Sequence, residues 1–309
     1  MIVTVTINPA IERIINVDRL AFEDRAYINS SRESAGGRGL NVSCVIHSFG
    51  AKTLAVTAQG GATGKRLVQH LKRCGFPVCY VPIRSAIRTN LTITDKQGLT
   101  VHLNEAGPKL TRSEVANFEK VLREKLEDAS WLMLCGSTPP GVPVSFYAEL
   151  IGVARQKRVR TLLHAGGEVL RQGIEAKPTV VTPNQHEAER LLGQILFTRA
   201  HFLEAAERIR MMGPETVVLS LASRGAVAAF ADGLVEAIPP SVQAISPIGG
   251  GDALAAGYTW AMSRRSKYTD ALRWGVAAGT ASALLPGMQF ATLEQTKAVY
   301  GQVEIRRPE

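Results

Sequence analysis

The sequence lacks the features that mark several large classes of protein. Its 309 residues include no Cys-x-x-Cys pair, and the six histidines form neither an HExxH motif nor a pair at metal-binding spacing. Aromatic residues make up 6% of the chain, and no basic stretch interleaves with them as it would on a nucleic-acid-binding surface. We therefore expect no nucleic-acid partner. The cysteines are predicted to be buried, reduced thiols: Cys44, Cys74, Cys79 and Cys135.

Long apolar runs are also missing. No segment approaches the ~18 consecutive apolar residues of a membrane span, and the N-terminus alternates like a strand, without the basic region of a signal peptide. We expect a soluble, cytoplasmic protein with no membrane partner. The composition is that of an ordinary globular protein, with 45% hydrophobic and 20% charged residues. The 36 basic residues exceed the 27 acidic ones, and a polyanionic small-molecule ligand explains part of this excess.

Short apolar segments that alternate with helical patterns indicate an α/β fold. Strands of this kind are typical of a parallel sheet that is buried on both faces, with helices on either side. The expected strands are 2–7, 53–58, 130–135, 159–163, 178–181 and 216–220. The expected helices are 39–49, 64–74, 112–127, 143–156, 185–193 and 201–212. No repeat or linker divides the chain, so residues 1–309 are predicted to form one domain.

Two polar, alternating stretches interrupt this pattern. Residues 13–34 and 88–105 are poor in helix signals, and their alternation predicts an antiparallel β-ribbon with one solvent-exposed face. Both are insertions in the α/β series. We therefore expect them to pair with each other as a small, discontinuous lid.

Three glycine clusters are candidate ligand-binding loops. The first, GGATGKR at 60–66, departs from P-loop spacing and is interpreted as a plain strand-to-helix turn. The second, GGRGLN at 36–41, precedes a helix, where its amides suit an anionic ligand. The third, GGGD at 249–252, opens an Ala-rich helix whose free amides and dipole suit developing negative charge. The alternatives are a tight turn with a solvent-facing Arg38, and an Asp252 that only caps its helix.

Seven segments, in order along nearly the whole chain, resemble the ribokinase-like sugar kinases of the phosphofructokinase B branch. They are TINPAIE at 6–12, GGRGLN at 36–41, IRTN at 87–90, GSTPPG at 136–141, TPNQHE at 182–187, SLASRGA at 220–226 and GGGD at 249–252. The resemblance implies a three-layer α/β/α domain with a mostly parallel sheet and a small β lid, which often forms a homodimer interface.

The resemblance also implies an activity. Members of this branch use ATP and Mg²⁺ to phosphorylate fructose 6-phosphate, fructose 1-phosphate or tagatose 6-phosphate. Two alternatives stay open: a kinase of an unphosphorylated sugar or nucleoside, and a sugar-phosphate-binding protein with weak catalysis.

Individual residues take roles from the same resemblance. Asp252 would be the base, and the amides of Gly249, Gly250 and Gly251 would hold the transferring phosphoryl group. The residues implied to bind the sugar phosphate are Glu12, Arg25, Gly37, Arg38, Asn41, Arg88 and Ser137. Those implied to bind the nucleotide are Thr182, Asn184, Ser220, Ala222, Gly225 and Gly279. Glu187 would hold Mg²⁺ through water, although Asn184 and Glu187 also have the spacing of a helix cap.

Four positions depart from the branch pattern. Glu12 replaces the opening aspartate, and Ala222 replaces a glycine where the nucleotide should approach the backbone. The DTSG segment becomes His164-Ala165-Gly166-Gly167, which loses the acid and both hydroxyls. Thr182 replaces a lysine and so removes a cation near the nucleotide phosphates. These changes put the affinity for ATP in question, whereas the retained Asp252 favours catalysis.

Overall fold

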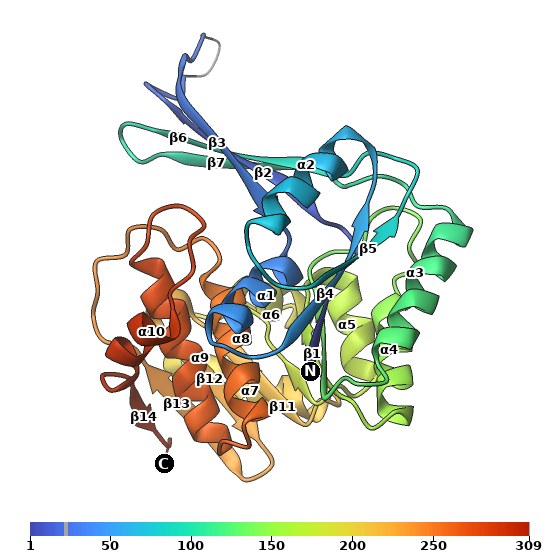
Figure 1. The fold of residues 1–309 in the computed structure, drawn as a ribbon. Helices are drawn as coiled ribbons and strands as arrows, with labels where there is room; N and C mark the ends of the chain where they lie inside the picture. The colour runs from blue at the N-terminus through green and yellow to red at the C-terminus, as the bar shows by residue number, and fades with distance from the viewer. Residues whose placement is uncertain (22–23, 309) are drawn as a thin grey trace.

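A ten-stranded β-sheet forms the centre of the computed structural model, which describes residues 1–21 and 24–308 (Figure 1). Its strands are β1 (Ile2–Thr6), β4 (Thr53–Gln59), β5 (Val78–Pro82), β8 (Trp131–Cys135), β9 (Arg160–His164), β10 (Val180–Val181), β11 (Thr216–Ser220), β12 (Ala226–Phe230), β13 (Gly233–Ile238) and β14 (Glu304–Arg306). In the described residues their order is β14-β13-β12-β11-β10-β9-β8-β1-β4-β5. Neighbours from β5 across to β11 are parallel, and those from β11 to β14 are antiparallel.

Successive residues of the central strands point to opposite faces of this sheet, and each face has its own hydrophobic core. In β8, Leu132 and Leu134 belong to one core, whereas Trp131 and Met133 belong to the other. This two-residue alternation is the geometry of any strand. Because both faces are covered, all of these residues are apolar, and the strand shows no polar alternation in sequence.

Helices cover both faces, which confirms the expected three-layer α/β/α architecture. One core is closed by α1 (Arg38–Ser48), α8 (Gly250–Ser263), α9 (Tyr268–Ala283) and α10 (Leu293–Tyr300). The other is closed by α2 (Gly61–Lys72), α3 (Arg112–Lys125), α4 (Phe146–Gln156), α5 (Gly167–Glu175), α6 (Gln185–Leu192) and α7 (Arg199–Met211). In the described residues, no helix is long and apolar enough to cross a membrane.

All the strands and helices expected above form, with ends within three residues of the expected bounds. Gly60 lies in a plain turn between β4 and α2, as its departure from P-loop spacing predicts. The patterns missed the edge strands β5 and β14, which are largely half-buried or exposed and therefore lack an apolar run. They also missed the antiparallel strands β12 and β13, which lie beside the parallel part of the sheet.

A separate four-stranded sheet projects from one end of the molecule (Figure 1). It consists of β2 (Ala10–Val17), β3 (Ile28–Gly36), β6 (Arg88–Asp95) and β7 (Thr100–Asn104), in the order β3-β2-β6-β7. The two hairpins are antiparallel, but β2 and β6 pair in parallel, so the prediction of an antiparallel ribbon is wrong at the centre of the sheet. The intervening β4, α2 and β5 return the chain to the end where β2 begins, and β6 therefore runs in the same direction as β2.

The four cysteines are free thiols. Only Cys135 is fully buried, so the prediction of burial is wrong for Cys44, Cys74 and Cys79. Cys79 lies on the edge strand β5, and Cys74 lies just after the end of α2, where neither face is fully covered.

Candidate active site

The carboxyl ends of neighbouring parallel strands converge at the end of the molecule that carries the small sheet. Asn8 follows β1, Ser137 follows β8, His164 ends β9 and Thr182 follows β10. The first turns of α1 and α8 meet at the same edge, where Asn41 contacts Asp252 across 211 positions of sequence. In open α/β sheets, ligands bind beyond the carboxyl ends of the strands. This edge is therefore the candidate active site.

Asp252 lies in the first turn of α8 and is 7% exposed. Its Oδ2 accepts a hydrogen bond from Asn41 Nδ2 at 2.7 Å, and its Oδ1 pairs with His164 Nε2 at 2.9 Å. Each carboxylate oxygen has a second lone pair that can accept a proton from a substrate hydroxyl. Within the described residues Asp252 accepts no bond from a backbone amide of its own helix. Its side chain is fixed by tertiary contacts, and the helix-cap alternative does not hold.

The start of α8 presents backbone amides to the same edge. The amide of Gly250 donates to the Pro247 carbonyl at 3.2 Å, whereas the amides of Gly251 and Asp252 have no backbone acceptor in the part of the chain that the structure describes. Together with the helix dipole, unpaired first-turn amides attract an anion. The Gly250 amide, which was expected to bind an anion, is therefore already hydrogen-bonded within the turn.

Small residues allow this loop to form. Gly249 caps α8 with a φ of 79°, a left-handed conformation, and a Cβ there would lie 2.8 Å from Phe290 Cε1. Gly279 on α9 faces the first turn of α8, because a Cβ there would lie 2.9 Å from the Gly250 carbonyl oxygen. The two glycines therefore fix the loop in position and let the two helices pack closely.

His164 connects Asp252 to the strand end that carries Thr182. His164 is 6% exposed, with Nε2 facing Asp252 and Nδ1 2.9 Å from Thr182 Oγ1. Nδ1 also lies 3.2 Å from the Thr182 carbonyl oxygen. Thr182 itself is 2% exposed. The Thr182 hydroxyl faces the histidine ring. Thr182 is therefore a hydrogen-bond partner of His164, at the position where the family pattern has a lysine.

Arg38 and Glu187 form an ion pair across 149 positions, with Arg38 Nη2 2.8 Å from Glu187 Oε1. Glu187 Oε2 accepts from the Asn184 amide, and Asn184 Oδ1 accepts from the Glu187 amide, both at 2.9 Å. The capping box is thus formed. A Cβ at Gly166 would lie 2.9 Å from Glu187 Oε1, so glycine at this position leaves room for the ion pair.

The charges around Arg38 favour its protonated form. Burial alone would lower the pKa of Arg38, but the carboxylates of Glu187 and Asp252 raise it above the ordinary value. The guanidinium is therefore a permanent cation beside Asp252. Its Nη1 is buried and has no partner in the described residues. That nitrogen is a donor suited to an anionic oxygen.

The fit of Mg²⁺ follows from the same contacts. Among the described residues there is no group of three His, Cys, Asp or Glu side chains that could enclose a metal ion. The Glu187 carboxylate accepts from Arg38 and from Asn184. Mg²⁺ retains much of its water and is commonly bound through substrate phosphates with few protein ligands. The residues fit an ion that Glu187 would contact through water, and not one enclosed by protein.

The small sheet contributes Glu12 and Asn90 to this edge. Asn90 Nδ2 donates to Glu12 Oε1 at 2.8 Å. Burial raises the pKa of Glu12, although the bond from Asn90 and the charge of Arg88 act in the opposite direction. A Cβ at Gly36 would lie 2.2 Å from Glu12 Cγ. The absence of a side chain at Gly36 therefore leaves room for glutamate, which is longer than the aspartate of the family pattern.

Arg88 begins β6 and joins the small sheet to the large one. Its Nη1 donates to the Glu105 carbonyl at 2.9 Å, and its Nη2 donates to the Asn8 carbonyl at 3.1 Å. Burial lowers the pKa of Arg88. Two of its five N–H groups hold the backbone, which leaves the others for an anionic ligand.

Several buried polar atoms at this edge have no partner in the described residues. Burying such an atom unpaired costs about 1–3 kcal/mol, so it usually marks a ligand contact or bound water. The atoms concerned are Thr6 Oγ1, Asn8 Oδ1, Arg38 Nη1, Arg88 Nε and Asn90 Oδ1. They include both donors and acceptors, which suits a ligand with hydroxyl groups and negative charge.

The segment expected to face the nucleotide has two unusual backbone positions. Ser220 ends β11 and bridges to Asn184. Ala222 opens the short 3₁₀ helix Ala222–Arg224 with a φ of 52°, which is strained for a residue with a Cβ. Gly225 has a φ of 88°, and a Cβ there would lie 2.0 Å from the Ala237 carbonyl oxygen. The glycine is required by its contact with β13.

The remaining predicted residues separate into two groups. Gly37 caps α1 with a φ of 130°, and a Cβ there would lie 2.5 Å from Thr6 Cγ2. Ser137 Oγ accepts from Asn8 Nδ2 at 3.1 Å. Both lie at the candidate site. Arg25, in contrast, is exposed in the connection between β2 and β3, at the end of the small sheet farthest from β1, and is not brought together with the others.

Sequence reasoning missed three residues of the site: Asn8, Asn90 and His164. Asn8 and Asn90 lie inside segments that carried the family resemblance, so the signal was present but no role was assigned to them. His164 was interpreted as a lost acid and as an alternative source of the cation missing at Thr182, and no contact with Asp252 was predicted. Its partner is 88 positions away, and no local pattern predicts such a contact.

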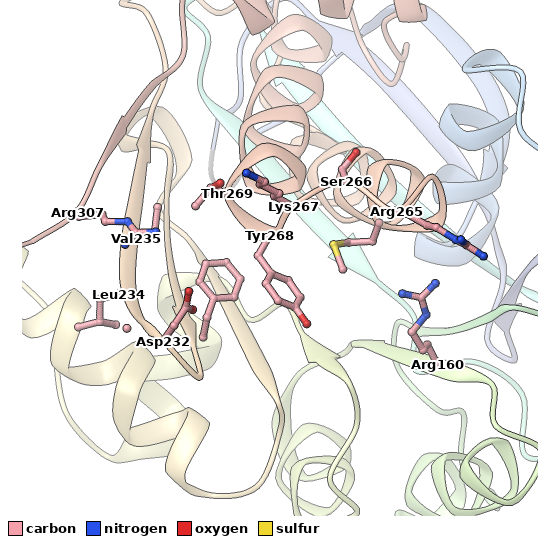
Figure 2. A pocket seen from close by; sticks show the side chains of 13 residues that line it. Arg160, Asp232, Leu234, Val235, Arg265, Ser266, Lys267, Tyr268, Thr269 and Arg307 are labelled. Atoms are coloured by element: carbon pink, nitrogen blue, oxygen red, sulfur yellow. The ribbon is translucent and has the colours of Figure 1, made fainter.

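A cavity of about 490 Å³ lies at the opposite end of the strands and is not part of this site. Figure 2 shows Arg160, Arg265, Lys267 and Tyr268 around it. Arg160 begins β9, whereas His164 ends that strand. Arg265 follows the end of α8, whereas Asp252 lies at its start. A whole strand and a whole helix therefore separate this cavity from the candidate active site.

Comparison with known proteins agrees with this geometry. The profile of the pfkB family carbohydrate kinases matches residues 2–295, nearly the whole chain. The chain belongs to this family. It is therefore an ATP-dependent carbohydrate kinase.

Individual relatives are similar along their full length. A 1-phosphofructokinase of Vibrio cholerae is 26% identical over 304 residues, which cover 98% of this chain and 96% of that protein. The crystal structure of phosphofructokinase-2 from Escherichia coli in complex with potassium has a TM-score of 0.91 at 27% identity, covering 97% and 98% of the two chains. A ribokinase of Arabidopsis thaliana, solved with ribose and ATP, has a TM-score of 0.78 at 18% identity, covering 97% and 98%. The kinase thus has the ribokinase-like fold.

Proposed function

We propose that this kinase transfers the γ-phosphoryl group of ATP to a hydroxyl of a hexose phosphate: fructose 6-phosphate, fructose 1-phosphate or tagatose 6-phosphate. The observation that carries the proposal is the Asp252 carboxylate. It is buried, held by Asn41 and His164, and placed in the first turn of α8 beside unpaired amides. Phosphoryl transfer needs a positioned proton acceptor and stabilised negative charge in one place, and this edge combines them.

Each group at the edge has a step to perform. The substrate hydroxyl loses its proton to Asp252 as its oxygen bonds to the γ-phosphorus, and the bond from that phosphorus to the bridging oxygen of ADP breaks. The amides of Gly251 and Asp252 stabilise the charge on the transferring group. Glu187 would contact Mg²⁺ through water, and the ion would supply neutralisation of phosphate charge. Because Arg38 pairs with Glu187, it keeps that carboxylate oriented.

The phosphate of the sugar is proposed to bind at Arg88 and Arg38. Both have buried N–H groups without a partner in the described residues. Arg88 donates to the Asn8 carbonyl, and Arg38 lies close to Asp252. Guanidinium groups bind phosphate through charge-assisted bonds. Glu12 and Asn90 of the small sheet bind sugar hydroxyls, together with Asn41 on α1 and Ser137 after β8. The small sheet of β2, β3, β6 and β7 acts as the lid over this substrate.

We propose in addition that the lid forms a homodimer interface. Its outer strands and their flanks expose apolar side chains: Tyr27, Ile28, Leu99, Val101 and Leu103. They lie at the two edge strands of the small sheet, β3 and β7, and exposed apolar side chains of this kind commonly mark an interface. Sedimentation velocity is expected to show a dimer. A Leu103→Lys variant is expected to sediment as a monomer, and a wild-type monomer would contradict the interface.

One panel assay tests the proposed activity. ADP release is measured with ATP, Mg²⁺ and, in turn, the three hexose phosphates, fructose, ribose and adenosine. The proposal expects turnover with at least one hexose phosphate and a much lower kcat/KM with the unphosphorylated compounds. Faster turnover of a free sugar or nucleoside would refute it. Binding of a hexose phosphate by calorimetry without ADP release would instead indicate a sugar-phosphate-binding protein with weak catalysis.

A further inference from the structure

We propose that His164 is a positioning residue for the catalytic carboxylate, and that its Nε2–H bond to Asp252 Oδ1 sets the orientation of the base. The inference rests on the proposed function of Asp252. The geometry that carries it is a buried chain of contacts from Thr182 through His164 to Asp252. Every member of this chain is less than 8% exposed.

The direction of the bond follows from the chemistry of the partners. An ionised carboxylate only accepts hydrogen bonds, so the 2.9 Å contact requires the proton on His164 Nε2. On the other side of the ring, Thr182 offers two groups. Its hydroxyl donates to Nδ1 when the ring is neutral, and its carbonyl accepts from Nδ1 when the ring is protonated. In both states Nε2 keeps its proton and continues to donate to Asp252.

The surroundings leave the ring no other role. The His164 side chain is buried, and its two nitrogens are each engaged, so neither faces a nucleotide phosphate. Its Cε1 lies under the first turn of α8, where a Cβ at Gly251 would be 3.8 Å away. The imidazole therefore fills the space beneath the helix start and supports the turn that carries Asp252.

Asn41 alone does not fix the carboxylate. Its amide holds Oδ2, and a single hydrogen bond leaves the carboxylate free to rotate about χ2. The bond from His164 to Oδ1 supplies the second anchor. A base displaced by about 1 Å typically loses on the order of 100-fold in rate, so two anchors have a direct kinetic consequence.

Charges from several elements also act at Asp252. Arg38 on α1 is attracted to it, while Glu12 on β2 and Cys135 on β8 lie close enough for the charge of Asp252 to raise their pKa values. Thr182, the other partner of His164, is uncharged.

A matched pair of variants tests the proposal. Glutamine at 164 can place an amide N–H near the position of Nε2, whereas asparagine reaches only the position of Nδ1; both are neutral amides. His164→Asn is expected to lower kcat about 10- to 100-fold with KM for ATP and sugar phosphate unchanged. His164→Gln is expected to recover most of the lost rate.

Wild-type kcat in a folded His164→Asn variant would overturn the proposal, and so would equal losses in the two variants. If neither variant folds, Thr182→Val provides the decisive measurement. It removes the hydroxyl partner of Nδ1 and is expected to lower kcat about 3- to 10-fold at unchanged KM; an unchanged kcat would refute the inference. Asp252→Asn separates the two claims. If it stays active, the proposed function fails, whereas if it is inactive and His164→Asn is not impaired, only this inference fails.

Discussion

Replacing Asp252 with asparagine is the most direct test of the catalytic assignment. The substitution keeps the shape of the side chain and removes its ability to take a proton from the substrate. A positioned general base contributes about 10²- to 10⁴-fold to a rate. We therefore expect Asp252→Asn to lower kcat by at least about 100-fold, which corresponds to a loss of about 2.7 kcal/mol of transition-state stabilisation.

The surrounding contacts predict that this variant still folds. Both neighbours donate to Asp252 in the wild type, so an asparagine NH₂ group facing either of them would oppose donor to donor. The conflict disappears if His164 moves its proton to Nδ1 and donates to the Thr182 carbonyl, 3.2 Å away. The asparagine then accepts from Asn41 and donates to His164 Nε2. With both bonds retained, we expect the free energy of unfolding to fall by no more than about 1 kcal/mol.

Three measurements on one preparation decide the matter. ADP release gives kcat, isothermal titration with a non-hydrolysable ATP analogue gives the nucleotide affinity, and thermal unfolding checks the fold. The expected result is a large loss of kcat with affinity and Tm nearly unchanged. A variant that keeps more than half of the wild-type rate would refute the role of Asp252 as base. Ser137→Ala, which removes a hydroxyl at the same edge but no proton acceptor, is the control and is expected to change KM more than kcat.

Four further predictions follow from the contacts of single side chains. Arg88→Ala should raise KM for the sugar phosphate about 10- to 100-fold and KM for ATP much less, as initial-rate kinetics will measure; equal effects would indicate a purely structural role. Thr182→Lys should lower the free energy of unfolding by on the order of 3 kcal/mol, because it places an ammonium in a 2% exposed position beside His164. Denaturant titration checks this against Thr182→Val, which should lose only about 1 kcal/mol. Ala222→Gly should relieve the strain at φ 52° and stabilise the fold by about 0.5–1 kcal/mol, a rise in Tm of roughly 1–2 °C; a lower Tm would contradict it. Glu12 has a raised pKa, so the folded state retains a proton that the unfolded state releases, and stability falls as pH rises from 4.5 through the folded value. Glu12→Gln should remove that part of the pH dependence, which unfolding at a series of pH values will show.

The sequence alone determined the central architecture. β8 and β11 are buried on both faces, and burial of that kind selects an uninterrupted apolar run that is readable without any partner. The start of α8 was also readable, because three glycines before an acid have few explanations other than a loop at a helix start. The family resemblance then connected Asp252 and Asn41 to one activity.

Tertiary structure decided how those pieces combine. The parallel pairing of β2 and β6 depends on the path of the intervening chain and has no signal in either strand. The ion pair of Arg38 with Glu187 joins residues 149 positions apart, and the bond of His164 to Asp252 joins residues 88 apart. Local sequence patterns report spacing along one element, whereas these contacts arise only where the ends of several elements meet. For that reason Asp252 could be proposed as the base from the sequence, whereas the contacts that hold its carboxylate in place could not be predicted.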